Sequence, residues 1–218
     1  MLRAAIFDMD GLLVDSEPLW RQAEQDVFGA LGLRLTDRDC TRTTGLRVDE
    51  VVRHWFAVHP WQGPGIAEVG ATIVERVVTL VRDRGEAKPG AAAAVATARC
   101  AGLRTALATG SSFDLIDATL ERLGLGGAFE VRCSAQSEPY GKPHPAVFLT
   151  TAARLGVDPT DCVVLEDSLP GVIAAKAARM RCIAVPETAG PERARFAVAD
   201  VVLDSLELVT VDLFASLS

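Results

Sequence analysis

Ala4-Ala5-Ile6-Phe7-Asp8-Met9-Asp10-Gly11-Leu12-Leu13-Val14-Asp15 opens as an apolar run and then turns polar. The apolar part is typical of a buried strand, and an extended backbone places Asp8 and Asp10 on the same side of the strand's carboxyl end. Two like charges this close repel each other unless a cation or a proton lies between them, which favours a magnesium site. The alternative is structural: one aspartate caps a helix and the other lies in a solvated turn.

The overall composition indicates a folded, acidic protein. Its 218 residues, 49% of them hydrophobic, are enough for one domain with a sizeable insertion or for two small domains. A net charge of −7 and a pI near 5.0 argue against nucleic acid or an anionic membrane as a partner, but a local cationic pocket can still bind a phosphorylated metabolite. We see no signal-peptide pattern and no apolar run of the roughly 20 residues that span a membrane, so we expect a cytoplasmic protein. We expect a monomer.

The five cysteines are scattered and form no CxxC pair of the kind found at zinc or redox sites. We expect them to be reduced residues in or near the core. They are Cys40, Cys100, Cys133, Cys162 and Cys182.

The segment 16–86 has a helical pattern throughout and no strand signal. Apolar residues recur at helical spacing, and breakers such as Gly32 and the stretch 59–65 separate the helices. The predicted helices run from Ser16-Glu17-Pro18 to Gly32, from Thr36 as the N-cap to about Thr44-Gly45, from Val48 to Val58, and from Ile66 to Arg84.

From Lys88 onward, helices alternate with short apolar strands. The predicted strands are 105–109, 129–133, 162–165, 182–185 and 201–203, and the predicted helices are 91–100, 113–123, 143–155 and 172–178. Such alternation predicts an α/β fold with a parallel sheet covered on both faces. A sheet of this kind binds ligands at the carboxyl ends of its strands.

Polar residues follow several of these strands at the carboxyl end. The stretch Thr109-Gly110-Ser111-Ser112 offers hydroxyl and N–H groups at a helix start, which favours anion binding, although a simple serine N-cap is the alternative. Lys142 precedes a helix, where an exposed lysine without a special role is the alternative. Glu166 and Asp167 follow a buried strand and offer the oxygen ligands that magnesium prefers.

Taken in order, four short motifs resemble the signatures of the haloacid-dehalogenase-like phosphohydrolases. The motifs are Asp8-Met9-Asp10-Gly11, Thr109 at a strand end, Gly141-Lys142-Pro143, and Glu166-Asp167. The resemblance covers nearly the whole chain and is strongest to the beta-phosphoglucomutase-like branch. It implies a Rossmann-like parallel-sheet core domain, residues 1–15 and 87–218, with a helical cap domain, residues 16–86, inserted after the first strand.

The same resemblance implies catalytic roles. Asp8 is expected to be the nucleophile that forms an aspartyl-phosphate, and Asp10 the general acid and base. Thr109, helped by Ser111, would hold a phosphoryl oxygen, and the Lys142 ammonium would offset charge on the phosphoryl group and on Asp8.

The cofactor that the resemblance implies is Mg²⁺. Asp8, the backbone carbonyl of Asp10, and Asp167 would be its ligands. Glu166 would be a further ligand or a partner just outside the ligand shell.

Several longer stretches resemble a narrower group, the bacterial phosphatases of 2-deoxyglucose 6-phosphate and hexitol phosphates. These stretches include Ser16-Glu17-Pro18-Leu19-Trp20, Gly45-Leu46-Arg47, 60–64, 142–145 and 176–181. The resemblance implies a phosphatase of small sugar or sugar-alcohol phosphates in carbohydrate metabolism. The substrate contacts are expected from Trp20, Arg47, Thr109, Ser111 and Lys142, with Trp61 as a further candidate; for each tryptophan a place in the core is the alternative.

Two other functions stay open at this point. A beta-phosphoglucomutase-type phosphomutase is the first, but its pattern has a histidine where this chain has Trp20, and an arginine one position later than Arg47. A phosphosugar-binding protein without turnover is the second, and the complete set of motif residues argues against it.

Overall fold

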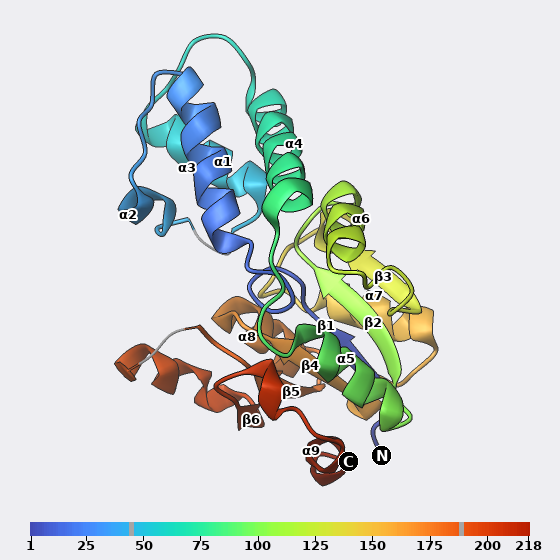
Figure 1. Ribbon diagram of the computed structural model, residues 1–218. Helices are drawn as coiled ribbons and strands as arrows, with labels where there is room; N and C mark the ends of the chain where they lie inside the picture. The colour runs from blue at the N-terminus through green and yellow to red at the C-terminus, as the bar shows by residue number, and fades with distance from the viewer. Residues whose placement is uncertain (44–45, 188–189) are drawn as a thin grey trace.

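The computed structural model describes residues 1–43, 46–187 and 190–218, and its centre is a six-stranded parallel sheet (Figure 1). The strands lie in the order β3-β2-β1-β4-β5-β6. Their bounds are β1 Ala4–Phe7, β2 Arg104–Thr109, β3 Val131–Ser134, β4 Cys162–Glu166, β5 Arg181–Ala184 and β6 Val201–Val202. The predicted α/β class with a parallel sheet is confirmed.

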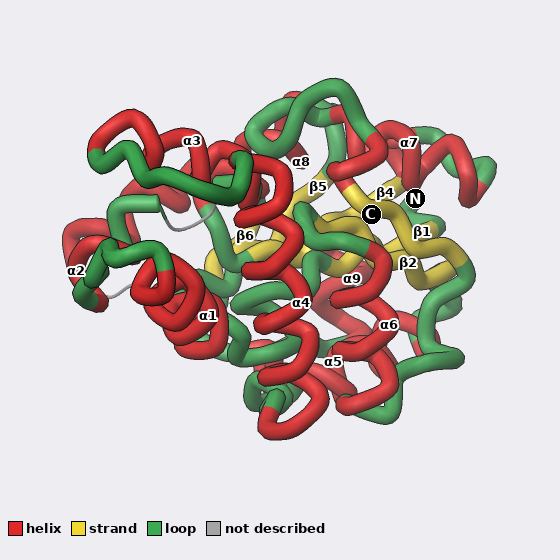
Figure 2. Tube along the Cα trace, turned by 90° about the horizontal axis from the view of Figure 1, so that it is seen from above, coloured by secondary structure: helices red, strands yellow, loops and turns green. Residues whose placement is uncertain are grey.

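Strand β1 lies in the middle of the sheet and is completely buried. Its alternate residues face two separate apolar clusters: Ala5 and Phe7 belong to one, Ala4 and Ile6 to the other. Helices cover both faces, as expected for parallel strands (Figure 2). The first cluster receives side chains from α5 Ala91–Cys100, α6 Phe113–Arg122 and α9 Val211–Ser216, and the second from α7 Ala146–Leu155 and α8 Leu169–Ala177.

The remaining helices lie together beyond the carboxyl ends of β1 and β2 (Figure 1). They are α1 Glu17–Ala30, α2 Asp37–Cys40, α3 Val48–Val58 and α4 Ile66–Arg84. Helix α4 packs against both α1 and α3, and its lower end packs against α6. No strand occurs among the described residues of 16–86, as predicted. The division into a core domain and a cap domain stays a prediction.

Four predicted boundaries are wrong by two residues or more. The helix expected from Val172 begins earlier, at Leu169, because Ser168 caps it by accepting a hydrogen bond from Gly171 N. The helix expected from Pro143 begins at Ala146, because His144 precedes Pro145 and a residue before proline avoids helical geometry. The strand expected from Phe129 begins at Val131, and the Phe129 ring instead packs against Phe7, with the ring centres 5.9 Å apart.

The fourth boundary is the end of the second helix. Helix α2 ends at Cys40, although Thr36 caps it through a reciprocal bond with Asp39 as the sequence indicates. The predicted end at Thr44-Gly45 lies outside the described residues.

All five cysteines are free. Cys40, Cys133, Cys162 and Cys182 are buried, but Cys100 is exposed, so its predicted place in or near the core is wrong. It lies at the last position of α5, on the face turned away from the sheet. Within the described residues, no helix is long and apolar enough to cross a membrane.

Candidate active site

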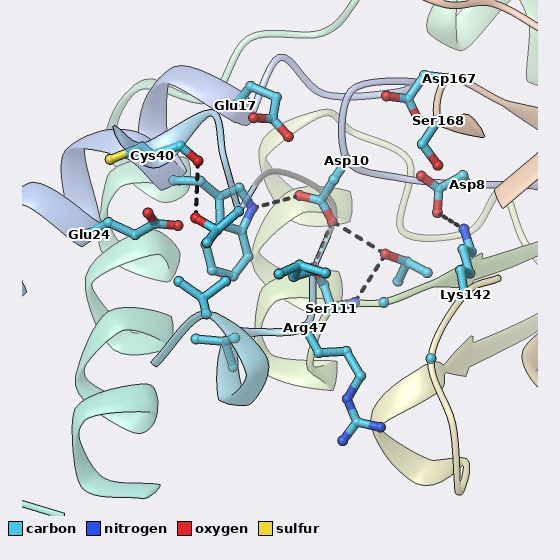
Figure 3. Close-up of a pocket in the computed structure, with 18 of the residues that line it drawn as sticks. Asp8, Asp10, Glu17, Glu24, Cys40, Arg47, Ser111, Lys142, Asp167 and Ser168 are labelled. Carbon is cyan, nitrogen blue, oxygen red and sulfur yellow. Dashed lines mark hydrogen bonds and ion pairs between the residues drawn. The ribbon is translucent and has the colours of Figure 1, made fainter. Parts of the chain in front are cut away.

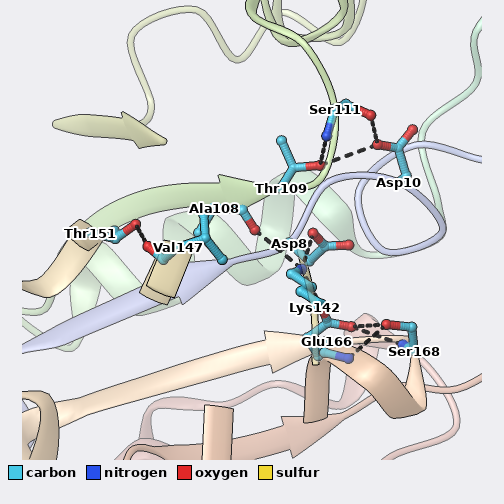
Figure 4. Close-up of polar contacts among 11 residues, drawn as sticks. Asp8, Asp10, Ala108, Thr109, Ser111, Lys142, Val147, Thr151, Glu166 and Ser168 are labelled. Carbon is cyan, nitrogen blue, oxygen red and sulfur yellow. Dashed lines mark hydrogen bonds and ion pairs between the residues drawn. The ribbon is translucent and has the colours of Figure 1, made fainter. Parts of the chain in front are cut away.

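The carboxyl ends of the three central strands bring the predicted site residues together. Asp8 follows β1, Thr109 ends β2 and Glu166 ends β4, while Lys142 arrives from the loop before α7 (Figure 4). Phe7 pairs with Leu165 in register, so Asp8 and Glu166 emerge side by side. A single cavity is lined by Asp8, Asp10, Trp20, Arg47, Thr109, Ser111, Lys142 and Asp167, together with other residues.

Lys142 joins two of the carboxylates. Its Nζ lies 2.7 Å from Asp8 Oδ1 and also pairs with Glu166 Oε1. All three side chains are almost completely buried. Burial by itself lowers the pKa of Lys142, but Asp8 and Glu166 outweigh burial and raise it, so the side chain stays a cation. Lys142 is therefore a buried charged group and not the exposed lysine of the alternative interpretation.

Asp8 is buried close to other carboxyl groups. Burial raises its pKa to about 7; Lys142 opposes this rise, while Glu166 and Asp10 add to it. Burial and the carboxylates of Glu166 and Asp8 likewise raise the pKa of Asp167. These raised pKa values mean that the site carries more negative than positive charge once its carboxyl groups are ionised.

The acidic group fits a divalent cation. Asp8, Glu166 and Asp167 each offer one oxygen, and these oxygens lie within 4.8 Å of one another. Asp167 Oδ1 is buried and has no hydrogen-bond partner among the described residues. One ammonium stands against three carboxylates, so a divalent cation would complete the charge balance and give Asp167 a partner.

Glu166 differs from its neighbours because protein donors already reach both of its oxygens. Oε1 pairs with Lys142, and Oε2 accepts hydrogen bonds from Ser168 N at 2.9 Å and Ser168 Oγ at 2.8 Å (Figure 4). Ser168 also caps α8 by accepting from Gly171 N. Glu166 thus links the Lys142 ammonium to the start of α8.

Asp10 lies beside this group and is fixed by a separate set of donors. Oδ1 accepts from Ser16 Oγ at 2.7 Å and from Trp20 Nε1 at 3.2 Å. Oδ2 accepts from Ser111 Oγ at 2.7 Å and from Thr109 Oγ1 at 3.3 Å (Figures 3 and 4). Its carboxylate therefore points away from Lys142, toward α1 and the end of β2.

Gly11 allows the chain to turn directly after the two aspartates. Its φ of +74° is a left-handed conformation that L side chains rarely adopt. A Cβ at this position would also run into the Asp167 carboxylate. The turn thus lets the loop after β1 pass close to the loop after β4.

The helical segment closes the far side of the cavity. Trp20 and Arg47 line it, and Arg47 Nε pairs with Asp49 Oδ1 at 3.2 Å. Trp61 does not line it: its ring is buried between Phe28 and Phe56, so its predicted alternative place in the core is the one observed. Gly45 lies outside the described residues.

The sequence motifs do not single out some of the polar residues near Asp10 and along the cavity. Ser16, predicted only as a helix start, does not line the cavity, but its hydroxyl donates a hydrogen bond to Asp10. Glu24 lines the cavity and is buried, although an acidic residue on a helix normally faces water. Its spacing of four residues from Trp20 puts it on the same helix face, and that spacing is the signal that could have revealed it.

Comparison with known proteins agrees with this geometry. A family model described as haloacid dehalogenase-like hydrolase matches residues 2–179. Hexitol phosphatase B of Escherichia coli (strain K12) is 48% identical over 96% of both chains. Protein CbbY of Cereibacter sphaeroides is 36% identical over 94% of this chain and 93% of the relative.

Solved structures with the same architecture include CbbY from Rhodobacter sphaeroides in complex with phosphate. It superposes with a TM-score of 0.84 at 32% identity, covering 95% of this chain and 96% of that one. A putative beta-phosphoglucomutase from Thermotoga maritima superposes with a TM-score of 0.77 at 26% identity, covering 99% of each chain. The match to the family model and the close relatives agree with the sheet topology, and the chain belongs to the haloacid dehalogenase-like hydrolases, an enzyme family.

Proposed function

We propose that this protein is a magnesium-dependent phosphatase that hydrolyses phosphomonoesters of small sugars or sugar alcohols through an aspartyl-phosphate on Asp8. The observation that carries the proposal is the contact of Lys142 with Asp8 and Glu166 at the carboxyl ends of the central strands. It places one carboxylate oxygen next to a cation in a buried cavity. A nucleophile and a group that neutralises the phosphoryl charge thus stand side by side.

In the first step, an Asp8 oxygen attacks phosphorus and the bond from phosphorus to the sugar oxygen breaks. Asp10 gives its proton to the leaving alkoxide. In the second step, a water oxygen attacks the phosphorus of the aspartyl-phosphate, Asp10 accepts the water's proton, and Asp8 is released as a carboxylate together with inorganic phosphate. Asp10 suits this role because Ser16, Trp20 and Ser111 hold it beside Asp8 without a pairing cation.

Thr109 ends β2 and Ser111 lies in the loop just before α6, where backbone N–H groups and hydroxyls favour an anion. Both hydroxyls reach Asp10, so a phosphoryl oxygen near Asp10 would lie near them too. Lys142, held by Glu166, offsets negative charge on the phosphoryl group. We propose that Glu166 mainly orients Lys142 and Ser168.

Asp8, Asp167 and the carbonyl of Asp10 are the proposed ligands of Mg²⁺. When bound, the cation withdraws charge from the phosphoryl oxygens and offsets the repulsion between the carboxylates. The unpartnered Asp167 Oδ1 supports this assignment.

The substrate class rests on the relatives. The most similar curated proteins reported above include a hexitol phosphatase, and this chain shares nearly half of its residues with it over almost the full length. Trp20 and Arg47 are the proposed substrate contacts from the helical segment, which we propose acts as a cap domain, residues 16–86, over a core domain of 1–15 and 87–218. A cytoplasmic protein would meet such substrates directly.

The runner-up function is a phosphomutase, which the similarity to putative beta-phosphoglucomutases favours. A mutase must keep water from the aspartyl-phosphate until a second sugar hydroxyl attacks. Trp20, the residue from α1 that contacts Asp10, carries no acid or base group and can only donate its N–H. The contact therefore favours release of the phosphoryl group to water.

The deciding experiment is a screen of the purified protein with Mg²⁺ against sugar, polyol and nucleotide monophosphates, with phosphate release as the signal. We expect hexose or hexitol 6-phosphates to be the best substrates. Phosphorus NMR with beta-glucose 1-phosphate and added glucose 1,6-bisphosphate then separates the two enzymes. Isomerisation faster than phosphate release would show that the protein is a phosphomutase. If no compound in the screen releases phosphate and no isomerisation occurs, the protein binds phosphosugars without turnover.

A further inference from the structure

Glu24 is a buried acid that the proposed chemistry does not use. It lies on α1, lines the cavity and is 8% exposed. Its Oε2 is buried and has no hydrogen-bond partner within the described part of the chain. A buried carboxylate oxygen without a donor destabilises a protein, so its presence inside a cavity indicates a ligand that supplies the donor.

The position of Glu24 on the helix relates it to the phosphoryl site. Helix α1 begins near the carboxyl end of β1 and runs away from the sheet (Figure 1). Trp20, in its first turn, contacts Asp10. Glu24 lies four residues later, on the same face and about 6 Å farther along the axis. Figure 3 shows its carboxylate on the side of the cavity that Cys40 also borders, away from Asp8 and Lys142. Both ends belong to one continuous cavity.

The polar groups around Glu24 are engaged elsewhere. Thr43 Oγ1 donates to the carbonyl of Cys40 at 3.0 Å, and Arg47 pairs with Asp49. The Cys40 thiol is adjacent, but a thiol is a weak donor. Arg21 also lines the cavity but lies 3.9 Å from Glu17, and Val48 and Val51 add an apolar wall. Neutral donors on a ligand are therefore the natural partners of the carboxylate.

From this geometry we propose that Glu24 is a specificity-determining residue that accepts hydrogen bonds from hydroxyl groups on the carbon chain of the substrate, away from its phosphate. The proposal deepens the proposed function and rests on it. A polyol or sugar phosphate satisfies both ends of the cavity at once: its phosphate lies at Asp8 and Lys142, and its remote hydroxyls meet Glu24. A phosphomonoester without remote hydroxyls leaves the carboxylate with only the weak donor of the Cys40 thiol.

The charge state of Glu24 supports the proposal. Burial raises its pKa to about 7; the neighbouring Cys40 opposes the rise, Glu17 adds to it and Arg21 opposes it. Arg21 lies 3.9 Å from Glu17, so it is shared between the two acids. Burial and Glu24 in turn raise the pKa of the Cys40 thiol to about 12, so the thiol stays protonated. Near pH 8 the carboxylate is thus mainly ionised and can accept two hydroxyl donors.

The test is a binding comparison that needs no turnover. Isothermal titration calorimetry with Mg²⁺ at pH 8 measures Kd for glucitol 6-phosphate and for inorganic phosphate, using Asp8→Asn protein with and without Glu24→Ala. We expect the Glu24→Ala change to raise Kd for glucitol 6-phosphate tenfold or more and Kd for phosphate less than twofold. Glu24→Gln, which keeps one acceptor and the size of the side chain, should recover part of the loss.

Glu75→Gln is the matched control, because Glu75 is an exposed glutamate on α4 of the same helical segment. It should leave both Kd values unchanged. An equal loss for both ligands, no loss for either, or no binding of glucitol 6-phosphate when Glu24 is intact would overturn the proposal. Phosphate release by the unmodified protein tests the proposed function separately, so the failure of one cannot be mistaken for the failure of the other.

Discussion

Trp20 Nε1 donates a hydrogen bond to Asp10 Oδ1 over 3.2 Å, and so joins α1 of the helical segment to the loop that follows β1. Ser16 donates to the same oxygen from the start of α1. The orientation of the proposed acid and base therefore depends on where α1 lies. Thr109 and Ser111 hold the other carboxylate oxygen of Asp10 from the end of β2, so Asp10 connects the helical segment to the sheet.

Trp20→Phe tests this link because it keeps the ring and removes the donor. A hydrogen bond to a charged group is worth about 1.5–3 kcal/mol, so we expect kcat for the best sugar phosphate to fall roughly tenfold or more, with a smaller change in KM. Steady-state kinetics measures both. Trp61→Phe is the control: its ring packs between Phe28 and Phe56, so it should lower stability and spare kcat. Unchanged turnover in Trp20→Phe would mean that the N–H does not position Asp10.

Asp8→Asn should abolish turnover and keep the fold. The amide has the size of the carboxyl but is a poor nucleophile, so we expect a loss of roughly 10³-fold or more in kcat. The change also removes repulsion with Glu166, while Lys142 keeps its contact with Glu166. Phosphate release and circular dichroism report the two effects. Near-normal turnover in a folded Asp8→Asn protein would remove Asp8 from the nucleophile role.

Chelation should inactivate the enzyme, and Mg²⁺ should restore it. Calcium should not restore activity, because it accepts more oxygen ligands with looser geometry and would engage both oxygens of Asp8. Mg²⁺ should also raise the Tm by binding only the folded protein, and Asp167→Asn should remove most of that rise while stabilising the chelated protein by relieving repulsion. Differential scanning calorimetry with and without the ion measures this. Full activity in excess chelator would contradict the site.

Gly11→Ala should damage both stability and the site, because the alanine must adopt φ near +74° and its methyl group meets Asp167. Gly102→Ala is the matched control: its φ is +77°, but no atom lies within 4 Å of the added methyl group. We expect Gly102→Ala to cost about 1 kcal/mol in free energy of unfolding and to leave activity intact. Gly11→Ala should cost more and also weaken Mg²⁺ binding. If Gly11→Ala and Gly102→Ala had equal effects in denaturant titration and in metal binding, the close approach of Gly11 to Asp167 would be refuted.

Glu24→Gln should stabilise the substrate-free protein at neutral and alkaline pH. Burial raises the pKa of Glu24 from 4.5 to about 7, so between these values the folded protein holds a proton that the unfolded chain has lost. The free energy of unfolding therefore falls as the pH rises through this window. The variant escapes this loss, so its advantage should grow from near zero at pH 4.5 to at most roughly 3 kcal/mol at pH 8.

Urea titrations in chelator at both pH values measure the Glu24→Gln effect. Glu75→Gln, on the exposed side of α4, should show a difference that does not change with pH in this way. An advantage of Glu24→Gln that is the same at both pH values would show that Glu24 is not a buried acid.

The sequence by itself determined the parallel sheet, most of the helix bounds and the order of the site motifs. Periodicity and breakers act over a few residues, which is why α3, α4 and α5 have the predicted bounds. A strand end is also visible locally, so Asp8, Thr109 and Glu166 could be placed at one edge of the sheet before any contact was known. The exceptions, such as the helix start at Ala146, arise where adjacent local signals compete.

Only the tertiary structure decided which side chains contact one another. Lys142 meets Asp8 across 134 positions of the chain, and nothing near either residue encodes that contact. Trp20 reaches Asp10 while Trp61 enters the core, although both are tryptophans of the same helical segment. Glu24 has the sequence signature of a solvated helix residue and is buried only because the helices around it close over a cavity. Contacts of this kind depend on strand register and helix packing, which sum over the whole chain and cannot be read from any short stretch of it.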